Sequence, residues 1–431
     1  MKNVNIGLIG FGTVGSGVVE CIQKNAELIA QRTGIKPVIS KVADTDITSD
    51  RGVTVPAGVL TTDANDVLER ADIDVVVELV GGTTIAKDFV LKALVNGKPV
   101  VTANKALLAT HGEEIFKTAR QSEVDVYYEA SVGGGIPVIK AMREGLVGNR
   151  FMEIHGILNG TCNYILTRME KESADFDKIL TEAQEAGYAE ANPSFDIDGI
   201  DTAHKATILA SLAYGEWFGM KSLHVEGIRS ITLQDIEYAT ALGYRIKLLA
   251  IIKQIDSDVQ MRVHPALIPM TSMLGHVEGV FNAISVCGDT VGDTMYYGRG
   301  AGREATASAV VADLIDVARN IKFGSRQRVP AFHPHEGYAK LVPMSDIETR
   351  YYVRLEALDQ PGVLALISGI LGRSGISIAS VTQEESPAES VPMIILTHRA
   401  KEAHMQQALA EIRELQEIVA APVVLRIEDV N

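Results

Sequence analysis

Charged side chains gather between residues 183 and 205, around two turns that precede a helical pattern. Asn192-Pro193 and Asp198-Gly199 mark the turns. Asp201 and Lys205 follow four residues apart, so on a helix they share one face. An isolated pair at this spacing is usually a surface salt bridge worth about 0.3–0.5 kcal/mol. Here it follows a dense group of acidic residues, which weakens that interpretation and indicates a functional site.

A second motif, Gly10-Phe11-Gly12-Thr13-Val14-Gly15, stands near the start of the chain, between a strand-like run and a helical pattern. Gly10 permits a tight turn, Gly12 lets the backbone approach a pyrophosphate, and Gly15 allows the helix to pack on the strand. The N–H groups at the start of the helix would face the anion. A strand, this motif and a helix in that order predict a dinucleotide-binding site.

Asp44, which ends the second strand-like run, bears on which dinucleotide binds. An acidic residue there can accept hydrogen bonds from the ribose hydroxyls of NAD, whereas a 2′-phosphate favours Arg or Lys. Lys41 and Arg51 lie close in sequence, and either could turn toward a phosphate. Asp44 could also simply cap a turn. The sequence favours NAD but leaves NADP open.

The first 140 residues alternate short Val-rich runs with helical patterns, which is typical of βαβ units around a mainly parallel, doubly wound sheet. A helix is expected over 14–32. Strands are expected over Val4–Ile9, Pro37–Ala43, Asp74–Leu79, Pro99–Ala103 and Asp125–Glu129. Their continuous apolar character indicates strands that are covered on both faces. Residues 1–140 are therefore predicted to form an α/β dinucleotide-binding domain.

The pattern changes to α+β between residues 141 and 325. Helices are expected over 177–187 and 202–213, and strands over 247–255 and 280–287. Residues 326–348, which contain three prolines and few apolar anchors, indicate a linker.

Residues 349–431 form a third predicted domain. The expected order is strand 351–358, helix 363–373, strand 376–382, strand 391–398, helix 401–418 and strand 422–427. This βαββαβ order is the ferredoxin-like layout.

Composition limits the class of protein. The 431 residues suggest two to four domains at roughly 100–200 residues each. Forty Lys and Arg against 55 Asp and Glu give a net charge of −15, which argues against a nucleic-acid partner. No apolar run reaches the roughly 18 residues of a membrane helix, and no signal sequence is evident, so we expect no membrane partner and a cytoplasmic location. Cys21, Cys162 and Cys287 are too far apart to indicate a disulfide framework or a thiolate metal site.

Several longer stretches resemble the homoserine dehydrogenase family. The acidic segment matches the family signature through Ala183, Gly187, Asn192-Pro193, Asp196, Gly199, Asp201 and Lys205. Three further stretches agree with the family, at residues 102–105, 129–137 and 158–166. The resemblance extends over essentially the whole chain. The last domain, with Asp359-Gln360-Pro361-Gly362-Val363-Leu364, resembles an ACT domain.

The resemblance implies a reversible, NAD(P)-dependent reduction of L-aspartate 4-semialdehyde to L-homoserine, a step toward threonine and methionine. It implies a Rossmann-type domain over 1–140, a catalytic and dimerisation domain over 141–325, and an ACT domain over 349–431. By family match Lys205 is the proton donor to the developing alkoxide, and Lys105, expected beside the nicotinamide, is a second candidate.

The resemblance also assigns binding residues. Glu190 and Asp201 would contact the substrate, with Asp196 supporting them. The cofactor would be held by Gly10, Phe11, Gly12, Thr13, Val14, Gly15, Asp44, Lys105, Gly187 and Gly302. A monovalent cation, Na⁺ or K⁺, would be held mostly by backbone carbonyls of Glu129, Val132, Gly134 and Ile136, although the Gly133–Gly135 run could be only a flexible turn. The family further implies a homodimer or homotetramer, and the ACT domain implies threonine as a candidate effector.

Two alternatives compete with this interpretation. A semialdehyde-oxidising dehydrogenase would need an activated thiolate, for which Cys162 is the candidate, although its position favours a packing role. A non-catalytic sensor could bind NAD through the first domain and an amino acid through the last. The presence of both Asp201 and Lys205 argues against a sensor.

Overall fold

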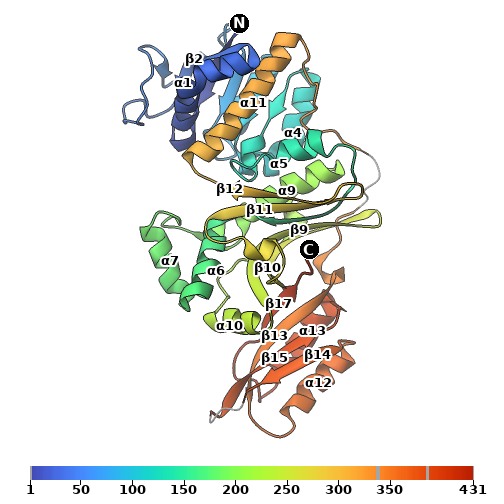
Figure 1. The fold of residues 1–431 in the computed structure, drawn as a ribbon. Coiled ribbons are helices and arrows are strands. Elements are labelled where there is room, and N and C mark those ends of the chain that lie inside the picture. The colour runs from blue at the N-terminus through green and yellow to red at the C-terminus, as the bar shows by residue number, and fades with distance from the viewer. Residues whose placement is uncertain (1, 336–339, 385–387, 431) are drawn as a thin grey trace. The chain divides into compact units, whose positions relative to one another are not determined.

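The computed structural model describes residues 2–335, 340–384 and 388–430 (Figure 1). The chain divides into two compact units. Unit 1 comprises residues 1–154, 204–221 and 281–338, and unit 2 comprises residues 155–203, 222–280 and 339–431. Strand β7 (Phe151–Ile157) and helix α9 (Ile200–Tyr214) continue from one unit into the other. These units do not test the predicted domain boundaries, which stay a prediction.

Unit 1 is built on a six-stranded parallel sheet in the order β3-β2-β1-β4-β5-β6. The strands are β1 (Lys2–Ile9), β2 (Ile35–Ala43), β3 (Leu60–Thr61), β4 (Val75–Glu78), β5 (Val100–Thr102) and β6 (Val126–Tyr127). This is the order of the doubly wound dinucleotide-binding fold. The mixed α/β fold class with a parallel sheet is therefore confirmed. The five predicted strands are all present, whereas β3 was not predicted because two residues carry no periodic signal.

Helices cover this sheet. They are α1 (Thr13–Thr33), α2 (Asn65–Leu68), α3 (Ile85–Val95), α4 (Lys105–Gln121), α5 (Val138–Lys140) and α11 (Arg303–Phe323). Helix α11 packs beside α1, although more than 250 residues separate them in sequence (Figure 1). Gly17 permits this contact, because a Cβ at that position would lie 2.9 Å from the side chain of Arg303. The hairpin of β11 (Phe281–Gly288) and β12 (Gly292–Arg299) completes the unit.

Unit 2 contains a sheet in the order β9-β10-β17-β13-β15-β14. The strands are β8 (His224–Val225), β9 (Tyr244–Ile255), β10 (Asp258–Pro269), β13 (Glu348–Leu358), β14 (Ile378–Gln383), β15 (Ser390–Thr397), β16 (Ala400–Lys401) and β17 (Val423–Ile427). The helices are α6 (Gly160–Glu172), α7 (Phe176–Glu185), α8 (Ser194–Ile197), α10 (Leu233–Ala241), α12 (Val363–Arg373) and α13 (Glu402–Arg413).

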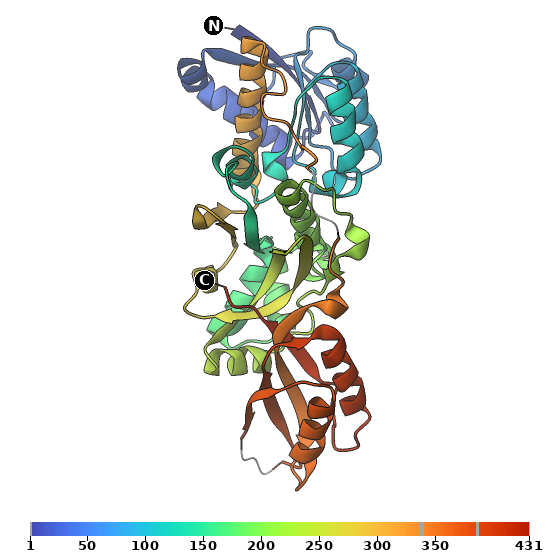
Figure 2. The ribbon, with the colours of Figure 1, turned by 90° about the vertical axis from the view of Figure 1, so that its right-hand side faces the viewer.

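The C-terminal module, residues 348–430, has the predicted βαββαβ order. Its helices α12 and α13 lie on one face of its strands (Figure 2). Its last strand, β17, also pairs in parallel with β10, through Ala266 with Arg426 and Leu267 with Ile427. The module therefore shares a continuous sheet with the strands that precede it.

The stretch predicted as a linker makes specific contacts. Phe332 is buried in unit 1, where its ring stacks on Phe116 at 5.9 Å and meets Trp217 edge-on at 5.3 Å. In unit 2, Leu341 forms a β-bridge with Val259. Residues 336–339 lie outside the described residues. At Phe332 and Leu341 this stretch therefore contacts the rest of its unit, and its role as a linker stays a prediction.

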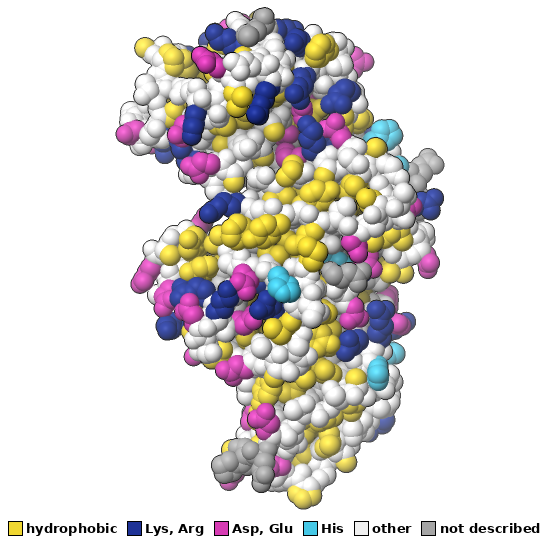
Figure 3. All heavy atoms as spheres, viewed as in Figure 1, with side chains coloured by type: hydrophobic (Ala, Val, Ile, Leu, Met, Phe, Trp, Pro, Cys, Tyr) yellow, Lys and Arg dark blue, Asp and Glu magenta, His cyan; other side chains and the backbone are white. Residues whose placement is uncertain are grey.

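Side-chain charges are mixed on the face shown in Figure 3, where basic and acidic groups are interspersed. Among the described helices, none is both long enough and apolar enough to span a membrane.

His264 occupies a buried position in unit 2 between two arginines. Its Nε2 accepts a hydrogen bond from Arg262 Nε at 3.2 Å, which places the proton of the neutral ring on Nδ1, 3.0 Å from the carbonyl oxygen of Pro265. Burial, and then the charges of Arg426 and Arg262, lower the pKa of His264 to about 3. The folded protein therefore holds this imidazole neutral.

This burial predicts a pH-dependent loss of stability. Below the unfolded-state pKa of about 6.5, His264 binds a proton in the unfolded chain but not in the folded one. The free energy of unfolding therefore falls as the pH drops from 6.5 toward 3. Between pH 7.5 and 5.5 the wild type should lose about 1–2 kcal/mol more than His264→Gln. Thermal melting of both proteins at the two pH values measures this difference. Equal pH dependence in the two proteins would contradict the assignment.

Candidate functional site

The glycine motif of unit 1 has the backbone geometry of a phosphate-binding turn. Gly10 has φ +100°, and a Cβ there would lie 2.5 Å from the carbonyl of Leu79. A Cβ on Gly15 would lie 2.0 Å from the carbonyl oxygen of Gly10, so strand and helix can approach only without a side chain. Gly12 precedes the first turn of α1 and faces open space. Of the intervening residues, Phe11 is buried, Val14 is half-buried and Thr13 is exposed at the helix start.

A hollow of about 600 Å³ lies at the carboxyl ends of the first strands. Gly10, Gly12, Asp44, Asp63 and Val80 are among its lining residues. In open α/β sheets ligands bind at this edge, and the open space beside Gly12 fits a dinucleotide pyrophosphate on the N-terminus of α1. No basic residue lines this hollow among the described residues.

Asp44 is fixed by backbone donors at the rim of the hollow. Its carboxylate accepts hydrogen bonds from Phe11 N at 2.5 Å and from Asp46 N at 2.8 Å. The two basic residues that could compete for a phosphate are engaged elsewhere. Lys41 donates to the carbonyl of Gly58 at 3.0 Å, and Arg51 pairs with Asp46 at 3.1 Å. Among the described residues that line the hollow, the charged ones are Asp44 and Asp63, and both are acidic.

Lys105 is the first residue of α4, directly after β5. The preceding Asn104 caps this helix by accepting a hydrogen bond from Leu107 N at 3.0 Å. The end of β5 is tied to β4, because Thr102 Oγ1 donates to Glu78 Oε2 at 2.7 Å. Burial raises the pKa of Glu78. We did not identify Glu78 from sequence, although an acidic residue that ends a buried valine run was an available signal.

The acidic segment of unit 2 is organised by Asn159. Its Nδ2 donates to Asp196 Oδ1 at 2.7 Å and to Asp201 Oδ2 at 3.0 Å. Its Oδ1 caps α6 by accepting from Cys162 N at 2.8 Å. Asp201 and Asn159 are buried, and Asp196 is half-buried. Sequence reasoning identified both carboxylates but not the Asn159 amide that joins them. Asn159 stands 37 residues before Asp196.

Asp201 and Lys205 stand one turn apart on α9, as their spacing predicts. Both residues are buried. A surface salt bridge, the simpler interpretation of this pair, is therefore wrong. Cys162 is also fully buried, and its Sγ lies 3.3 Å from the carbonyl oxygen of Asp196, which is consistent with a packing role.

Three other predicted residues lie in turns. Gly187 (φ +76°) follows α7, and Gly302 (φ +116°) precedes α11. Glu190 has an exposed side chain, and its carbonyl oxygen accepts a hydrogen bond from Gln184 Nε2 at 2.9 Å. Gly187 and Glu190 belong to unit 2 and Gly302 to unit 1, so their roles at a shared site stay predictions.

The predicted cation loop is a tight backbone turn in unit 1. Gly133 and Gly134 have φ +72° and +55°. The carboxylate of Glu129 accepts from the N–H groups of Ile139 and Lys140 at 2.8 and 2.7 Å, and burial raises the pKa of Glu129 to about 7. The backbone N–H groups thus engage the carboxylate of Glu129, and the binding of a cation by the carbonyl oxygens of this loop stays a prediction.

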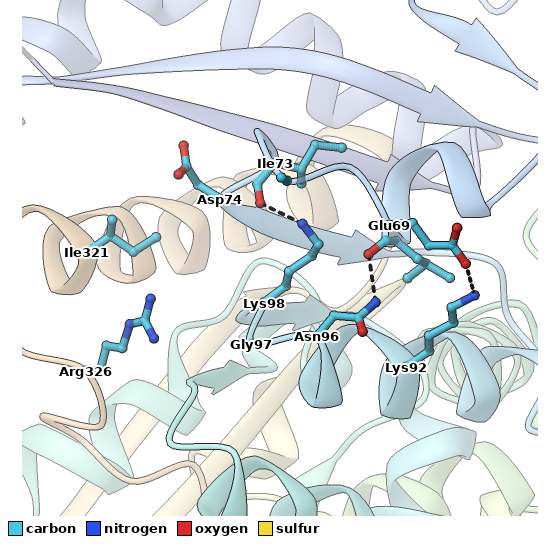
Figure 4. Close-up of a pocket in the computed structure, with 11 residues that line it drawn as sticks. Glu69, Ile73, Asp74, Lys92, Asn96, Gly97, Lys98, Ile321 and Arg326 are labelled. Carbon is cyan, nitrogen blue, oxygen red and sulfur yellow. Dashed lines mark hydrogen bonds and ion pairs between the residues drawn. The ribbon is translucent and has the colours of Figure 1, made fainter.

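A second hollow, of about 670 Å³, lies at the opposite edge of the unit 1 sheet, beside residues that precede β4 and β5 (Figure 4). Its lysines are already engaged. Lys92 pairs with Glu69 at 2.6 Å, and Lys98 donates to the carbonyls of Arg70 and Ile73 at 2.5 and 3.0 Å. None of the motif residues lines it.

Family models match most of the chain. The model described as "Homoserine dehydrogenase, NAD binding domain" matches residues 10–129, and the model described as "Homoserine dehydrogenase" matches residues 137–315. The model described as "ACT domain" matches residues 351–417.

Individual proteins show the same likeness. A homoserine dehydrogenase of Pseudomonas aeruginosa is 47% identical over 438 residues and is covered, like this chain, over 100% of its length. The crystal structure of a homoserine dehydrogenase from Thiobacillus denitrificans is 45% identical with a TM-score of 0.95, covering 100% of this chain and 99% of that one. A hyperthermophilic archaeal homoserine dehydrogenase in complex with NADPH is 27% identical with a TM-score of 0.63, covering 73% of this chain and 98% of that one.

The geometry of Gly12 and Gly15 predicts that an alanine substitution affects cofactor binding at one position and stability at the other. Gly15→Ala should lower the melting temperature, because its Cβ would collide with the Gly10 carbonyl. Gly12→Ala should fold like the wild type yet bind NAD(H) at least about tenfold more weakly, because its methyl group would occupy the place of the pyrophosphate. Thermal melting and titration of NADH fluorescence measure the two effects. Normal NADH binding by folded Gly12→Ala would contradict the proposed position of the pyrophosphate.

Proposed function

The chain belongs to the homoserine dehydrogenase family, and we propose that Lys205 is the proton donor in the reaction it catalyses. That reaction is the reversible, NAD(P)-dependent reduction of L-aspartate 4-semialdehyde to L-homoserine, in the biosynthesis of threonine and methionine. The observation that carries the proposal is the burial of Asp201 and Lys205 one turn apart on α9.

The chemistry requires a donor of this kind. The reduced cofactor supplies a hydride to the aldehyde carbon, and negative charge then develops on the aldehyde oxygen. An ammonium at that oxygen stabilises the charge and delivers a proton, leaving a neutral amine on Lys205. In the reverse direction the neutral amine takes the proton from the hydroxyl group of homoserine. Lys105 is the second candidate for this role.

Carboxylates would orient the substrate. Homoserine and aspartate semialdehyde carry an α-ammonium group, which needs anionic partners. Asp201 and Glu190 are proposed to contact the substrate, and Asp196 supports Asp201 through the shared Asn159 amide. That amide supplies a hydrogen bond to each of the two carboxyl groups, of which the Asp201 group is buried.

Asp44 is proposed to favour NAD over NADP. Its fixed carboxylate would accept hydrogen bonds from ribose hydroxyls and repel a 2′-phosphate. The backbone donors from Phe11 and Asp46 support this role, since they hold the charge at the rim of the hollow. Gly187 and Gly302 are proposed to approach the cofactor as well.

Further features of the enzyme are proposed from family membership. These are a monovalent cation at the carbonyls of the 129–136 loop, a homodimer or homotetramer, and a cytoplasmic location. The ACT domain is proposed to bind an amino acid, with threonine, the pathway product, as the candidate. Its Asp359 accepts a hydrogen bond from Gln383 at 3.1 Å, and Gly362 has φ +99°, so the loop between β13 and α12 is well defined.

Replacement of the proton donor should reduce turnover. We expect Lys205→Ala to lower kcat by about 10²–10⁴, the range of a positioned general acid, and to leave NADH binding within about twofold. Absorbance at 340 nm with homoserine and either nicotinamide cofactor measures the rate. Lys105→Ala is the matched comparison, and a larger loss in that variant than in Lys205→Ala would transfer the role to Lys105.

Removal of the Asp44 charge should change cofactor preference. Asp44→Asn removes the charge that repels a 2′-phosphate and keeps an oxygen for one of the two backbone donors, which bind different oxygens of Asp44. We expect the ratio of kcat/KM for NAD to that for NADP to fall about tenfold or more. Asp63→Asn, at another acidic position of the same hollow, is the control. An unchanged ratio in Asp44→Asn would make Asp44 a turn residue only.

A further inference from the structure

The acidic turn, residues 196–201, lies against a second segment of unit 2, the strap formed by residues 224–229. Ile228 N donates to the carbonyl oxygen of Ile197 at 2.8 Å. Gly227 packs so closely that a Cβ there would lie 2.1 Å from the same oxygen. Gly199 (φ +82°) is close to the strap from the other side, because its Cβ would lie 3.2 Å from the carbonyl oxygen of Glu226. A shift of the strap backbone would therefore displace the turn.

Side chains reinforce this backbone contact. Arg229 donates to the carboxylate of Asp198, with one bond of 3.2 Å, and to Ser194 Oγ at 2.9 Å. Strap and turn thus form one hydrogen-bonded layer. Asp196 and Asp201 are the end residues of the turn, and Asn159 joins their side chains. The positions of the two carboxylates depend on this layer.

The C-terminal module holds the strap through Arg426 of β17. This guanidinium is 1% exposed. Its Nη1 and Nη2 donate to Glu226 at 2.8 and 3.0 Å, and its Nε and Nη2 donate to Glu402 at 2.9 and 2.5 Å. Tyr351 OH donates to Glu402 at 2.9 Å. One guanidinium therefore makes paired hydrogen bonds to a carboxylate of the strap and to a carboxylate of the module.

The contact between Arg426 and Glu226 is stabilised by charge. Burial acts to raise the pKa of Glu226, but hydrogen bonds from His224 and Arg426 outweigh it and keep that pKa below its ordinary range. Glu226 therefore stays charged near neutral pH. Arg426 is buried although Glu226 is partly exposed, so separation of the pair would leave two N–H groups of a buried guanidinium without this carboxylate.

We propose that Arg426 is a positioning residue for the substrate site. It fixes Glu226, Glu226 fixes the strap, and the strap sets the position of Asp196 and Asp201. The inference rests on the proposed function in one respect, namely that Asp201 contacts the substrate. By this proposal the C-terminal module contributes to the affinity for homoserine. Other residues carry out the hydride and proton transfers.

Glu226→Gln tests the proposal. The amide keeps the shape of the side chain, Arg426 keeps its partner Glu402, and position 226 is partly exposed, so folding should persist. An amide offers one oxygen where the carboxylate offers two, so the paired contact is lost. We expect the KM for homoserine to rise about 5- to 20-fold, while kcat and the KM for the cofactor stay within about twofold. Arg426→Lys, which keeps the charge but not the paired geometry, should give the same split.

Arg354→Lys is the matched control. Arg354 of β13 also ties the module to the preceding part of unit 2, through Asp235 of α10 at 2.6 and 3.1 Å and through Thr232 at 3.3 Å, two residues outside the strap. The Arg354→Lys variant should have a lower melting temperature and an unchanged KM for homoserine. An unchanged KM in folded Glu226→Gln, or an equal rise in Arg354→Lys, would overturn the proposal.

Hydrogen exchange supplies a readout that does not depend on activity. Amides of residues 196–201 should exchange faster in Glu226→Gln than in the wild type, and no faster in Arg354→Lys. Unchanged exchange at this turn in Glu226→Gln would overturn the inference even if the KM rose. Absence of homoserine turnover in the wild type would instead overturn the proposed function, and the exchange comparison would still decide whether Arg426 positions the turn.

Discussion

The amide of Asn159 joins the carboxyl groups of Asp196 and Asp201, the second of which is buried. Burial of a charge is costly unless hydrogen bonds replace the lost water, and one NH₂ group supplies such bonds to both Asp196 and Asp201. The same side chain caps α6, so the start of that helix and the start of α9 are set by one residue. The strap contacts this segment through the bond from Ile228 N to the carbonyl oxygen of Ile197, and Arg426 contacts the strap through Glu226.

The two units fix their functional groups in different ways. Unit 1 depends mainly on backbone geometry, since Gly10 and Gly15 allow approaches that no side chain would permit. Unit 2 depends mainly on side chains, with Asn159, Glu226 and Arg426 each bound to at least two partners. A nucleotide presents a similar phosphate to many proteins, which backbone N–H groups can recognise. A small amino-acid substrate differs from its relatives by a few polar atoms, so its recognition needs specific side chains.

Sequence reasoning was most successful where the pattern is local. The valine-rich strands, the glycine motif and the βαββαβ order were all evident, and α12 begins and ends at the predicted residues 363 and 373. Asp201 and Lys205 were identified by their spacing. Asn159 stood inside a recognised motif, but its role depends on residues about 40 positions away. Glu226 and Arg426 are 200 residues apart, and no periodicity signals such a pair. The linker prediction missed the packing of Phe332, because one aromatic residue among prolines gives little indication of burial.

The pairing of β17 with β10 also affects how the protein folds during synthesis. The part of the β10 edge that receives Arg426 and Ile427 is complete only when β17 has been made. At about 5–20 residues per second, the ribosome needs roughly 10–30 s to synthesise the intervening segment. Throughout that interval this part of the β10 edge is unpaired. Arg262, which is buried in the folded protein, is then also without its partner Glu428. Such an edge is a template for wrong pairing until β17 has been made.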